Sequence, residues 1–247
     1  MGFDVIVLGA TFLGAGIAEA LGDRCLMIDR RPQAGYEFIN SLKFGHRFDK
    51  PLKTEAARSL FENFNQNGAF EGDRICLFEC APHFYSLLLD KNVLLNTEII
   101  SVEHNDDGFT VTTHGVSGYR VHKAKTVIDT RSLPDAATEK YLNFIVNTDK
   151  GATLPDRLDT EKFGYECDTV VKCKVDMSDG YQTARKKVFD IVTTLEGFKV
   201  AMVADEFEYT IKNEIPKSET GITLFPSQSY ANPLLAFDAG VIMGGEL

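Results

Sequence analysis

Long apolar runs are missing from this sequence, in which no stretch reaches the roughly 18 apolar residues that a helical membrane span requires. The chain also starts directly with a strand pattern, without the charged and apolar regions of a secretory signal, so we expect a cytoplasmic protein. Basic residues are in deficit, since 26 Lys and Arg residues stand against 36 Asp and Glu residues, giving a formal net charge of −10. This deficit argues against general binding to nucleic acid or to an anionic membrane surface.

Paired cysteine motifs are missing as well. The five cysteines are odd in number and include no C-x-x-C pair, so we expect neither disulfide bonds nor a zinc site. Cys76 and Cys80 would share one face of a helix, which leaves a metal or redox role as the alternative to ordinary buried thiols. What is present is 44% apolar and 25% charged residues over 247 positions, enough for a globular protein with a proper core.

The beginning of the chain carries the most informative pattern. An apolar run over residues 4–8 stops at Gly9, a helical pattern follows over residues 12–21, and a second apolar run over residues 25–28 ends at Asp29. This order predicts a strand-turn-helix-strand unit of the dinucleotide-binding type. The alternative is an ordinary turn of a parallel sheet that holds no ligand.

The spacing within this unit has a chemical reason. Gly9 allows a sharp turn off the strand, Gly14 allows the helix to pack closely on the strand, and the start of the helix presents free N–H groups to a pyrophosphate. Asp29 follows Gly9 by 20 residues, where a carboxylate accepts hydrogen bonds from an adenosine ribose. Thr11 stands in place of the middle glycine, so its Cβ narrows the approach to the phosphates while its hydroxyl offers a donor.

Two pairs of basic residues follow this unit. Arg30 and Arg31 begin a loop containing proline and glycine, and a guanidinium there is expected on a phosphate or against an adenine, unless the loop is simply a solvated basic turn. His46 is the first candidate for a catalytic acid or base, with a structural histidine as the alternative. Its neighbour Arg47, or Arg131 further along, is suited to hold an acidic substrate by bidentate pairing.

The rest of the chain alternates between helix and strand patterns. Residues up to 134 predict helices over 54–64 and 83–89 and a meander of strands over 93–102, 109–113 and 119–121. The meander leads into an apolar strand that begins at Thr126 and ends in small polar residues before Pro134. The pattern then changes to that of an α+β unit, with strands over 141–147, 169–175, 199–204 and 206–212 and a helix over 182–195. A short strand over 221–226 and a small-residue helix over 234–243 follow. Free amides at the start of this helix suit a partly negative group, unless the helix is simply capped.

Taken together, these pieces resemble the FAD-dependent oxidoreductases of the glutathione-reductase-like class. The resemblance is carried by Gly9-Ala10-Thr11-Phe12-Leu13-Gly14 with Asp29, the meander from Val93, Val127-Ile128-Asp129-Thr130-Arg131 and the terminal strand, turn and helix. It implies an α/β fold, with an FAD/NAD(P)-binding Rossmann-type domain of parallel sheet and β-meander over residues 1–134 and 214–247. A small inserted α+β substrate domain would then occupy residues 135–213.

The resemblance also implies a set of cofactor contacts. Asp129 and Arg131 replace the alanine and the glycine of the family's alanine-threonine-glycine strand end, and a terminal Gly-Asp pair is not recognisable. The residues that the resemblance brings to the cofactor are Gly9, Thr11, Phe12, Gly14, Asp29, Arg30, Arg31, Ile99, Thr130, Arg131, Pro226, Asn232, Pro233 and Leu234.

The function implied is an FAD-dependent oxidoreductase that transfers a hydride between bound flavin and a small organic substrate held between the two domains. Without a second glycine-rich fingerprint or a C-x-x-C disulfide, the reductase branch that carries both is disfavoured. One alternative is an NAD-binding enzyme of the same fold. The other is a non-catalytic interaction subunit with a degenerate cofactor site, so an oligomer or a partner subunit stays open.

Overall fold

The main sheet contains the strands of the N-terminal unit. The computed structural model describes residues 2–72, 74–148, 158–162, 168–195, 197–211 and 221–247. Within them, seven strands form this sheet in the order β5-β2-β1-β8-β7-β6, with β14 beside β8. The strands are β1 (Phe3–Leu8), β2 (Cys25–Ile28), β5 (Val93–Leu94), β6 (Glu98–Asn105), β7 (Gly108–Gly115), β8 (Gly118–Asp129) and β14 (Thr223–Leu224).

The N-terminal unit forms as its sequence predicts. β1 runs parallel to β2 on one side and to β8 on the other, and all four residues of β2 are buried, as expected for a strand covered on both faces. Gly9 turns the chain off β1 with φ 107°, a conformation that favours glycine. Helix α1 (Phe12–Leu21) follows, and the 3-10 turn η1 (Gly22–Arg24) leads into β2. The carboxyl ends of β1, β2 and β8 therefore meet at one edge of the sheet.

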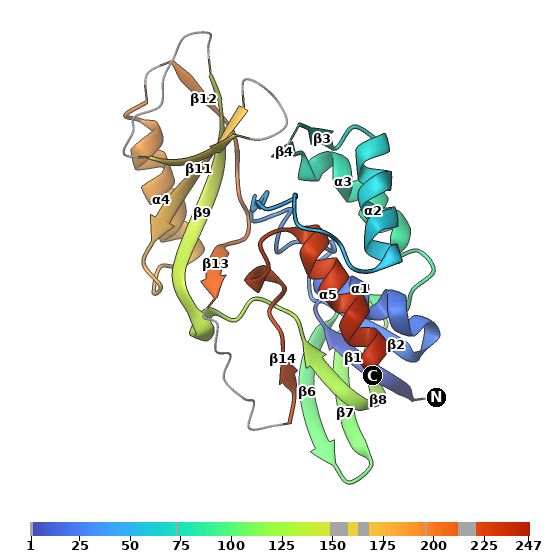
Figure 1. Ribbon diagram of the computed structural model, residues 1–247. Helices are drawn as coiled ribbons and strands as arrows, with labels where there is room; N and C mark the ends of the chain where they lie inside the picture. Colours follow the sequence, from blue (N-terminus) through green and yellow to red (C-terminus); the bar gives the residue numbers. More distant parts are fainter. Residues whose placement is uncertain (1, 73, 149–157, 163–167, 196, 212–220) are drawn as a thin grey trace.

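Helix α1 packs tightly against the C-terminal helix α5 (Pro233–Glu246), as the two crossing helices in Figure 1 show. The contact needs glycines on both sides. A Cβ on Gly16 would lie 2.1 Å from the carbonyl oxygen of Phe237, and a Cβ on Gly240 would lie 2.1 Å from that of Leu13. The glycines of both helices thus allow the two backbones to come into direct contact.

The meander differs from the prediction in two places. The apolar run expected as one strand over 93–102 is split into β5 and β6, because Asn96 takes a positive φ of 50° and breaks the strand between them. The strand expected over 119–121 and the strand expected from Thr126 are instead one long strand, β8, which ends at Asp129. Its first half pairs with β7 and its second half with β1, so one strand joins the meander to the parallel part of the sheet.

A second sheet forms a separate lobe at the upper left of Figure 1. Its helix α4 (Tyr181–Val192) buries Ala184 and Val188. Its strands, after the 3-10 turn η2 (Pro134–Ala136), are β9 (Ala137–Thr148), β10 (Asp159–Lys162), β11 (Asp168–Val175), β12 (Phe198–Val203) and β13 (Glu208–Ile211). These elements fall within the predicted insert, but its boundary at residue 214 lies outside the described residues. The domain limits therefore stay a prediction.

Two helices and a hairpin cover α1 and α5 at the upper right of Figure 1. They are α2 (Glu55–Gln66), the strands β3 (Phe70–Glu71) and β4 (Arg74–Ile75), and α3 (Leu77–Leu87). The prediction that a helix starts after Pro82 is wrong, because α3 begins at Leu77 and contains this proline. The apolar face of Leu77, Cys80 and Phe84 is fully buried and outweighs the one hydrogen bond that the proline forfeits. No helix of the described residues is both long enough and apolar enough to cross a membrane.

Candidate functional site

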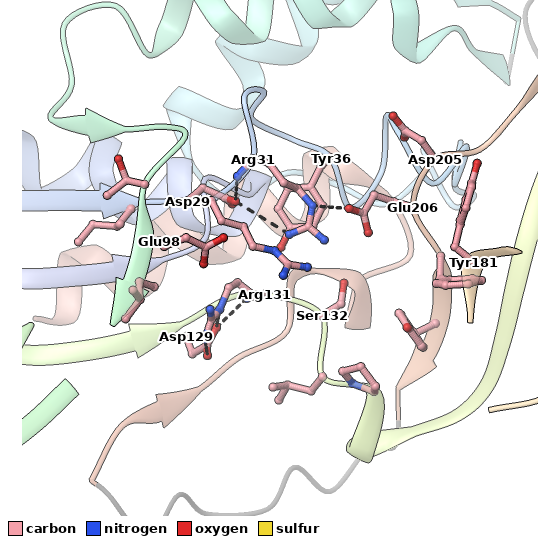
Figure 2. A pocket seen from close by; sticks show the side chains of 18 residues that line it. Asp29, Arg31, Tyr36, Glu98, Asp129, Arg131, Ser132, Tyr181, Asp205 and Glu206 are labelled. Carbon is pink, nitrogen blue, oxygen red and sulfur yellow. Dashed lines mark hydrogen bonds and ion pairs between the residues drawn. The ribbon is translucent and has the colours of Figure 1, made fainter. Parts of the chain in front are cut away.

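A cavity of about 520 Å³ opens at the carboxyl ends of β2 and β8, facing the second sheet. Parallel α/β sheets bind their ligands at this edge. Asp29, Asp129 and Arg131 line it from the main sheet, and Tyr181 and Glu206 line it from the insert (Figure 2). Thr97, Glu98 and Ile99 at the start of β6 add a third wall, so the predicted adenine strand does reach the cavity.

Asp29, the predicted ribose ligand, follows β2 and binds backbone N–H groups that follow β1 and β2. Its carboxylate accepts one hydrogen bond from the N–H of Ala10 and one from the N–H of Arg31, both at 2.9 Å. Only 1% of Asp29 is exposed, and this burial raises the pKa of the carboxyl while the two hydrogen bonds lower it. Each carboxylate oxygen keeps lone pairs beyond those used by these amides, so a ribose hydroxyl has acceptors left.

Arg31 crosses the cavity and ties the two sheets together. Its guanidinium lies over the ring of Tyr36, 3.6 Å from the centroid, and pairs with the carboxylate of Glu206 from the insert, as Figure 2 shows. Tyr36 is 2% exposed, burial raises the pKa of its hydroxyl well above the usual value, and the hydroxyl has no partner among the described residues. Arg30 is exposed on the rim of the same cavity.

Arg131 is already paired. Its guanidinium donates to both carboxylate oxygens of Asp129, at 2.9 and 2.7 Å, in the bidentate geometry that the sequence suggested for an acidic substrate. Its stem also covers the first turn, because a Cβ on Gly9 would lie only 2.8 Å from its Cγ. Thr130 is fully buried and donates to the carbonyl oxygen of Leu8 at 3.1 Å. Arg131 thus takes the space above the glycine turn.

The start of α1 is closed by the chain's own side chains. Thr11 caps the helix by accepting from the N–H of Gly14 at 3.0 Å. The N–H of Phe12 donates to the carboxylate of Glu37 at 2.8 Å, and the N–H of Leu13 donates to the hydroxyl of Ser227 at 3.3 Å. Phe12, Leu13 and Gly14 are buried, and none of them lines the cavity at Asp29.

Glu37 was not among the residues that the sequence indicated. Its carboxylate oxygen Oε1 also accepts from the hydroxyl of Ser227 at 2.8 Å, whereas Oε2 has no partner among the described residues. The residue is fully buried, and this burial raises the pKa of its carboxyl to about 7, with a further contribution from the charge of Asp29. No sequence motif marks such a pairing, because Glu37 and Ser227 are 190 residues apart.

These contacts decide how a dinucleotide fits. The two residues that the resemblance brings to the adenosine end, Asp29 and Ile99, line the same cavity, whereas their contact with a cofactor stays a prediction. The pyrophosphate of a dinucleotide does not match the start of α1 while Glu37 and Ser227 hold the amides of Phe12 and Leu13. At most one half of the molecule therefore fits the described conformation.

The predicted contacts at the C-terminal turn form a separate group. Pro226, Asn232, Pro233 and Leu234 are all buried. Asn232 caps α5 by accepting from the N–H of Leu235 at 2.8 Å, and its amide donates to the carbonyl oxygen of His46 at 2.9 Å. The N–H of Leu235 in the first turn of α5 thus has an acceptor in the chain, as the capped-helix alternative expects.

His46 and Arg47 line a second cavity of about 580 Å³. Both side chains are exposed. Arg47 has a φ of 62°, an unfavourable conformation for a residue with a Cβ, and the amide of Asn232 bonds the carbonyl oxygens of His46 and Arg47 around this strained position. Tyr209 lines both cavities. Among the described residues, no group of His, Cys, Asp and Glu is suited to a metal ion.

Comparison with solved structures identifies the fold. No protein-family model and no curated protein matches the chain. It is similar to p-nitrophenol 4-monooxygenase PnpA from Pseudomonas putida DLL-E4, with a TM-score of 0.60 and 14% identity over 98% of this chain and 77% of that one. It is also similar to OxyS anhydrotetracycline hydroxylase from Streptomyces rimosus, with a TM-score of 0.59 and 13% identity over 100% of this chain.

A third similar structure is a ternary complex of aklavinone-11 hydroxylase with FAD and aklavinone, with a TM-score of 0.54 and 12% identity over 98% of this chain. The chain spans 62% of the length of OxyS and 60% of that of aklavinone-11 hydroxylase. The likeness is to aromatic hydroxylases rather than to the glutathione-reductase branch that the sequence resemblance named. The chain thus has the FAD-binding Rossmann-type fold of flavoprotein hydroxylases.

Proposed function

We propose that this chain is an FAD-dependent oxidoreductase acting on a small organic substrate, in the cytoplasm. Flavin would supply the redox chemistry, a hydride transfer, and the protein would supply binding and placement. The fold supports the proposal, since one structure of the same fold was solved with FAD bound. The activity, substrate and partners of the longer hydroxylases do not transfer with the fold.

The observation that carries the proposal is the placement of Asp29. Its carboxylate stands at the end of β2, on the cavity at the edge of the parallel sheet, and the start of β6 with Ile99 forms the facing wall. An adenosine needs such a pair of features, an acceptor for its ribose hydroxyls and backbone beside its base. The position of Asp29 and Ile99 on one cavity supports the proposal.

The second cavity is the better place for the substrate. Arg131 is engaged by Asp129, so of the two arginines that the sequence offered for an acidic group we assign Arg47. His46 beside it stays the candidate acid or base. Since the chain carries a net charge of −10, exposed cations lining a cavity favour an anionic substrate locally. If His46→Ala leaves turnover unchanged on a true substrate, that assignment is wrong.

The first test is the visible absorption spectrum of the purified protein, before and after incubation with FAD and gel filtration. We expect a flavin spectrum that is lost in Asp29→Ala and in Gly14→Leu, with mass analysis of the released molecule giving FAD. Release of NAD instead would favour the NAD-binding alternative, because both molecules share the adenosine end. Failure to take up either cofactor, in the wild type and also in a variant without the Glu37 carboxylate at the start of α1, would exclude both enzyme hypotheses.

The non-catalytic subunit is the second candidate function, and a specific observation favours it. Glu37 and Ser227 satisfy the helix amides that a pyrophosphate uses, so the fold is complete without a cofactor. A colourless protein that elutes together with another chain from its own source, and takes up no FAD in any variant, would support this candidate.

A further inference from the structure

We propose that Glu37 is an internal stand-in for the cofactor pyrophosphate, and that its carboxylate, rather than Thr11 in the glycine motif, limits the affinity of the chain for FAD. The inference rests on the proposed function, because FAD is the ligand whose phosphates it concerns. Glu37 would thereby weaken the binding of ligands that carry a pyrophosphate and leave the binding of adenosine unchanged.

The position of the carboxylate is the first argument. α1 is ten residues long, so its first N–H groups have no acceptor within the helix, and its N-terminus carries the partial positive charge that attracts an anion. Glu37 Oε1 lies 2.8 Å from the nitrogen of Phe12, and the hydroxyl of Ser227 links it to the next amide, that of Leu13. A phosphate at this helix start would use the same two amides. Carboxylate and phosphate therefore cannot occupy the position together.

The second, independent argument is that one oxygen of the buried Glu37 carboxylate has no hydrogen-bond partner among the described residues. This oxygen is Oε2, whereas a buried carboxylate ordinarily has both oxygens hydrogen-bonded. The side chain is nine-tenths buried or more, and it lies against the helix start. The start of α1 therefore suits an anion with more acceptor oxygens than Glu37 uses there, and a phosphate is such an anion.

The backbone around Glu37 is firmly held. Its carbonyl oxygen accepts from the amide of Gln228 at 2.6 Å and from the hydroxyl of Ser41 at 2.7 Å. The N–H of Gly35 donates to the carbonyl oxygen of Ala10 at 2.7 Å. FAD binding thus requires the side chain of Glu37 to move while its backbone stays in place.

Thr11, by contrast, does not face the phosphate position with its hydroxyl. That hydroxyl accepts from the N–H of Gly14 and donates to the hydroxyl of Thr130 at 2.7 Å, so it is engaged on the side of β8. Restoring glycine at this position would remove a helix cap without freeing the amides of Phe12 and Leu13.

A series of three ligands tests the inference. Adenosine, ADP and FAD are titrated into the wild-type protein, Glu37→Ala and Glu37→Gln by calorimetry. We expect adenosine to bind all three proteins within about twofold, since it carries no phosphate. ADP and FAD should bind Glu37→Ala at least about tenfold more tightly than the wild type, which corresponds to one order of magnitude in Kd. Glu37→Gln should fall between them, because it removes the charge and keeps an oxygen acceptor.

Glu62→Ala is the matched control, since it removes one negative charge from an exposed position of α2. It should leave all three affinities unchanged. Equal FAD affinity of the wild type and Glu37→Ala overturns the inference while leaving the proposed function intact. Absence of FAD binding in every variant overturns both. If Glu37→Ala fails to fold, Glu37→Gln alone decides. This neutral side chain of the same size must bind ADP and FAD more tightly than the wild type does, while its affinity for adenosine stays the same.

Discussion

The hydroxyl of Thr11 donates a 2.7 Å hydrogen bond to the hydroxyl of Thr130, and this bond joins the start of α1 to the end of β8. Thr130 in turn donates to the carbonyl oxygen of Leu8, so the three chain segments at the sheet edge are tied by two neighbouring hydroxyls. The threonine that interrupts the glycine motif therefore has a structural role. It holds together the edge at which the cavity opens.

Thr11→Gly should lower stability without improving FAD affinity. It removes the N-cap of α1 and the bond to Thr130, for which we expect a loss of about 1 to 2 kcal/mol in the free energy of unfolding. Urea unfolding measures the loss. Thr11→Ser keeps the hydroxyl and should stay within about 0.5 kcal/mol of the wild type. A gain of tenfold or more in FAD affinity for Thr11→Gly would show that the threonine, not Glu37, blocks the phosphates.

Glu37 should make the protein less stable as the pH rises. Burial raises the pKa of its carboxyl from an ordinary value of 4.5 to about 7, so the folded state binds the proton more tightly than the unfolded state does. The contribution is fully present below about pH 4.5 and is lost as the pH rises through 7, with a size of about 3 kcal/mol. Burial of Asp29 acts in the same direction.

The comparison with Glu37→Gln isolates this effect, because Asp29 is common to both proteins. The difference in unfolding free energy between Glu37→Gln and the wild type should grow in favour of the variant between about pH 4.5 and 7.5. A difference that stays constant over this range would mean that Glu37 is ionised throughout.

The contact between α1 and α5 should be highly sensitive to added volume. Gly16→Ala and Gly240→Ala each place a methyl group 2.1 Å from a backbone carbonyl oxygen of the other helix, which demands that the helices separate. We expect a loss of about 3 kcal/mol or more for each. The added Cβ of Gly245→Ala in α5 meets nothing within 4 Å, so this variant should raise the free energy of unfolding by about 0.5 kcal/mol. Thermal unfolding of the three variants would contradict the close packing if all three shift alike.

Arg47 should bind an organic anion at the second cavity. Benzoate should bind the wild type more tightly than benzamide, and Arg47→Ala should weaken benzoate binding by about tenfold or more through loss of a charge-assisted hydrogen bond. Arg47→Gly should bind like Arg47→Ala but be more stable by about 1 kcal/mol, since glycine relieves the positive φ of 62°. Calorimetry with both ligands and urea unfolding measure the two effects separately. Equal binding of benzoate and benzamide to the wild type would remove Arg47 from the substrate site.

The sequence predicted the parts of the fold that local patterns determine. The turn at Gly9, the helix over residues 12–21 and the helix that starts after Thr54 all stand where their spacing and caps placed them. The errors lie where tertiary contact outweighs a local signal. Pro82 sits inside α3 because the buried face of that helix extends beyond the proline on both sides.

The contacts of the candidate site were only partly predictable. Asp29 and Ile99, which the resemblance assigned to the adenosine, line one cavity, whereas their contact with a cofactor stays a prediction. The pairing of Glu37 with Ser227, and of Arg31 with Glu206, joins residues more than 170 positions apart. Such pairs leave no periodicity and no spacing in a single sequence, so only the folded arrangement identifies them.

The central claim is that the chain binds FAD and that Glu37 opposes it. The most direct measurement is the flavin absorbance that Glu37→Ala and the wild type each retain after incubation with excess FAD and gel filtration. We expect Glu37→Ala to retain about one equivalent of FAD and the wild type to retain clearly less under the same conditions. Flavin retained equally by both proteins would contradict the role of Glu37, and a colourless Glu37→Ala protein that still folds would contradict FAD binding itself.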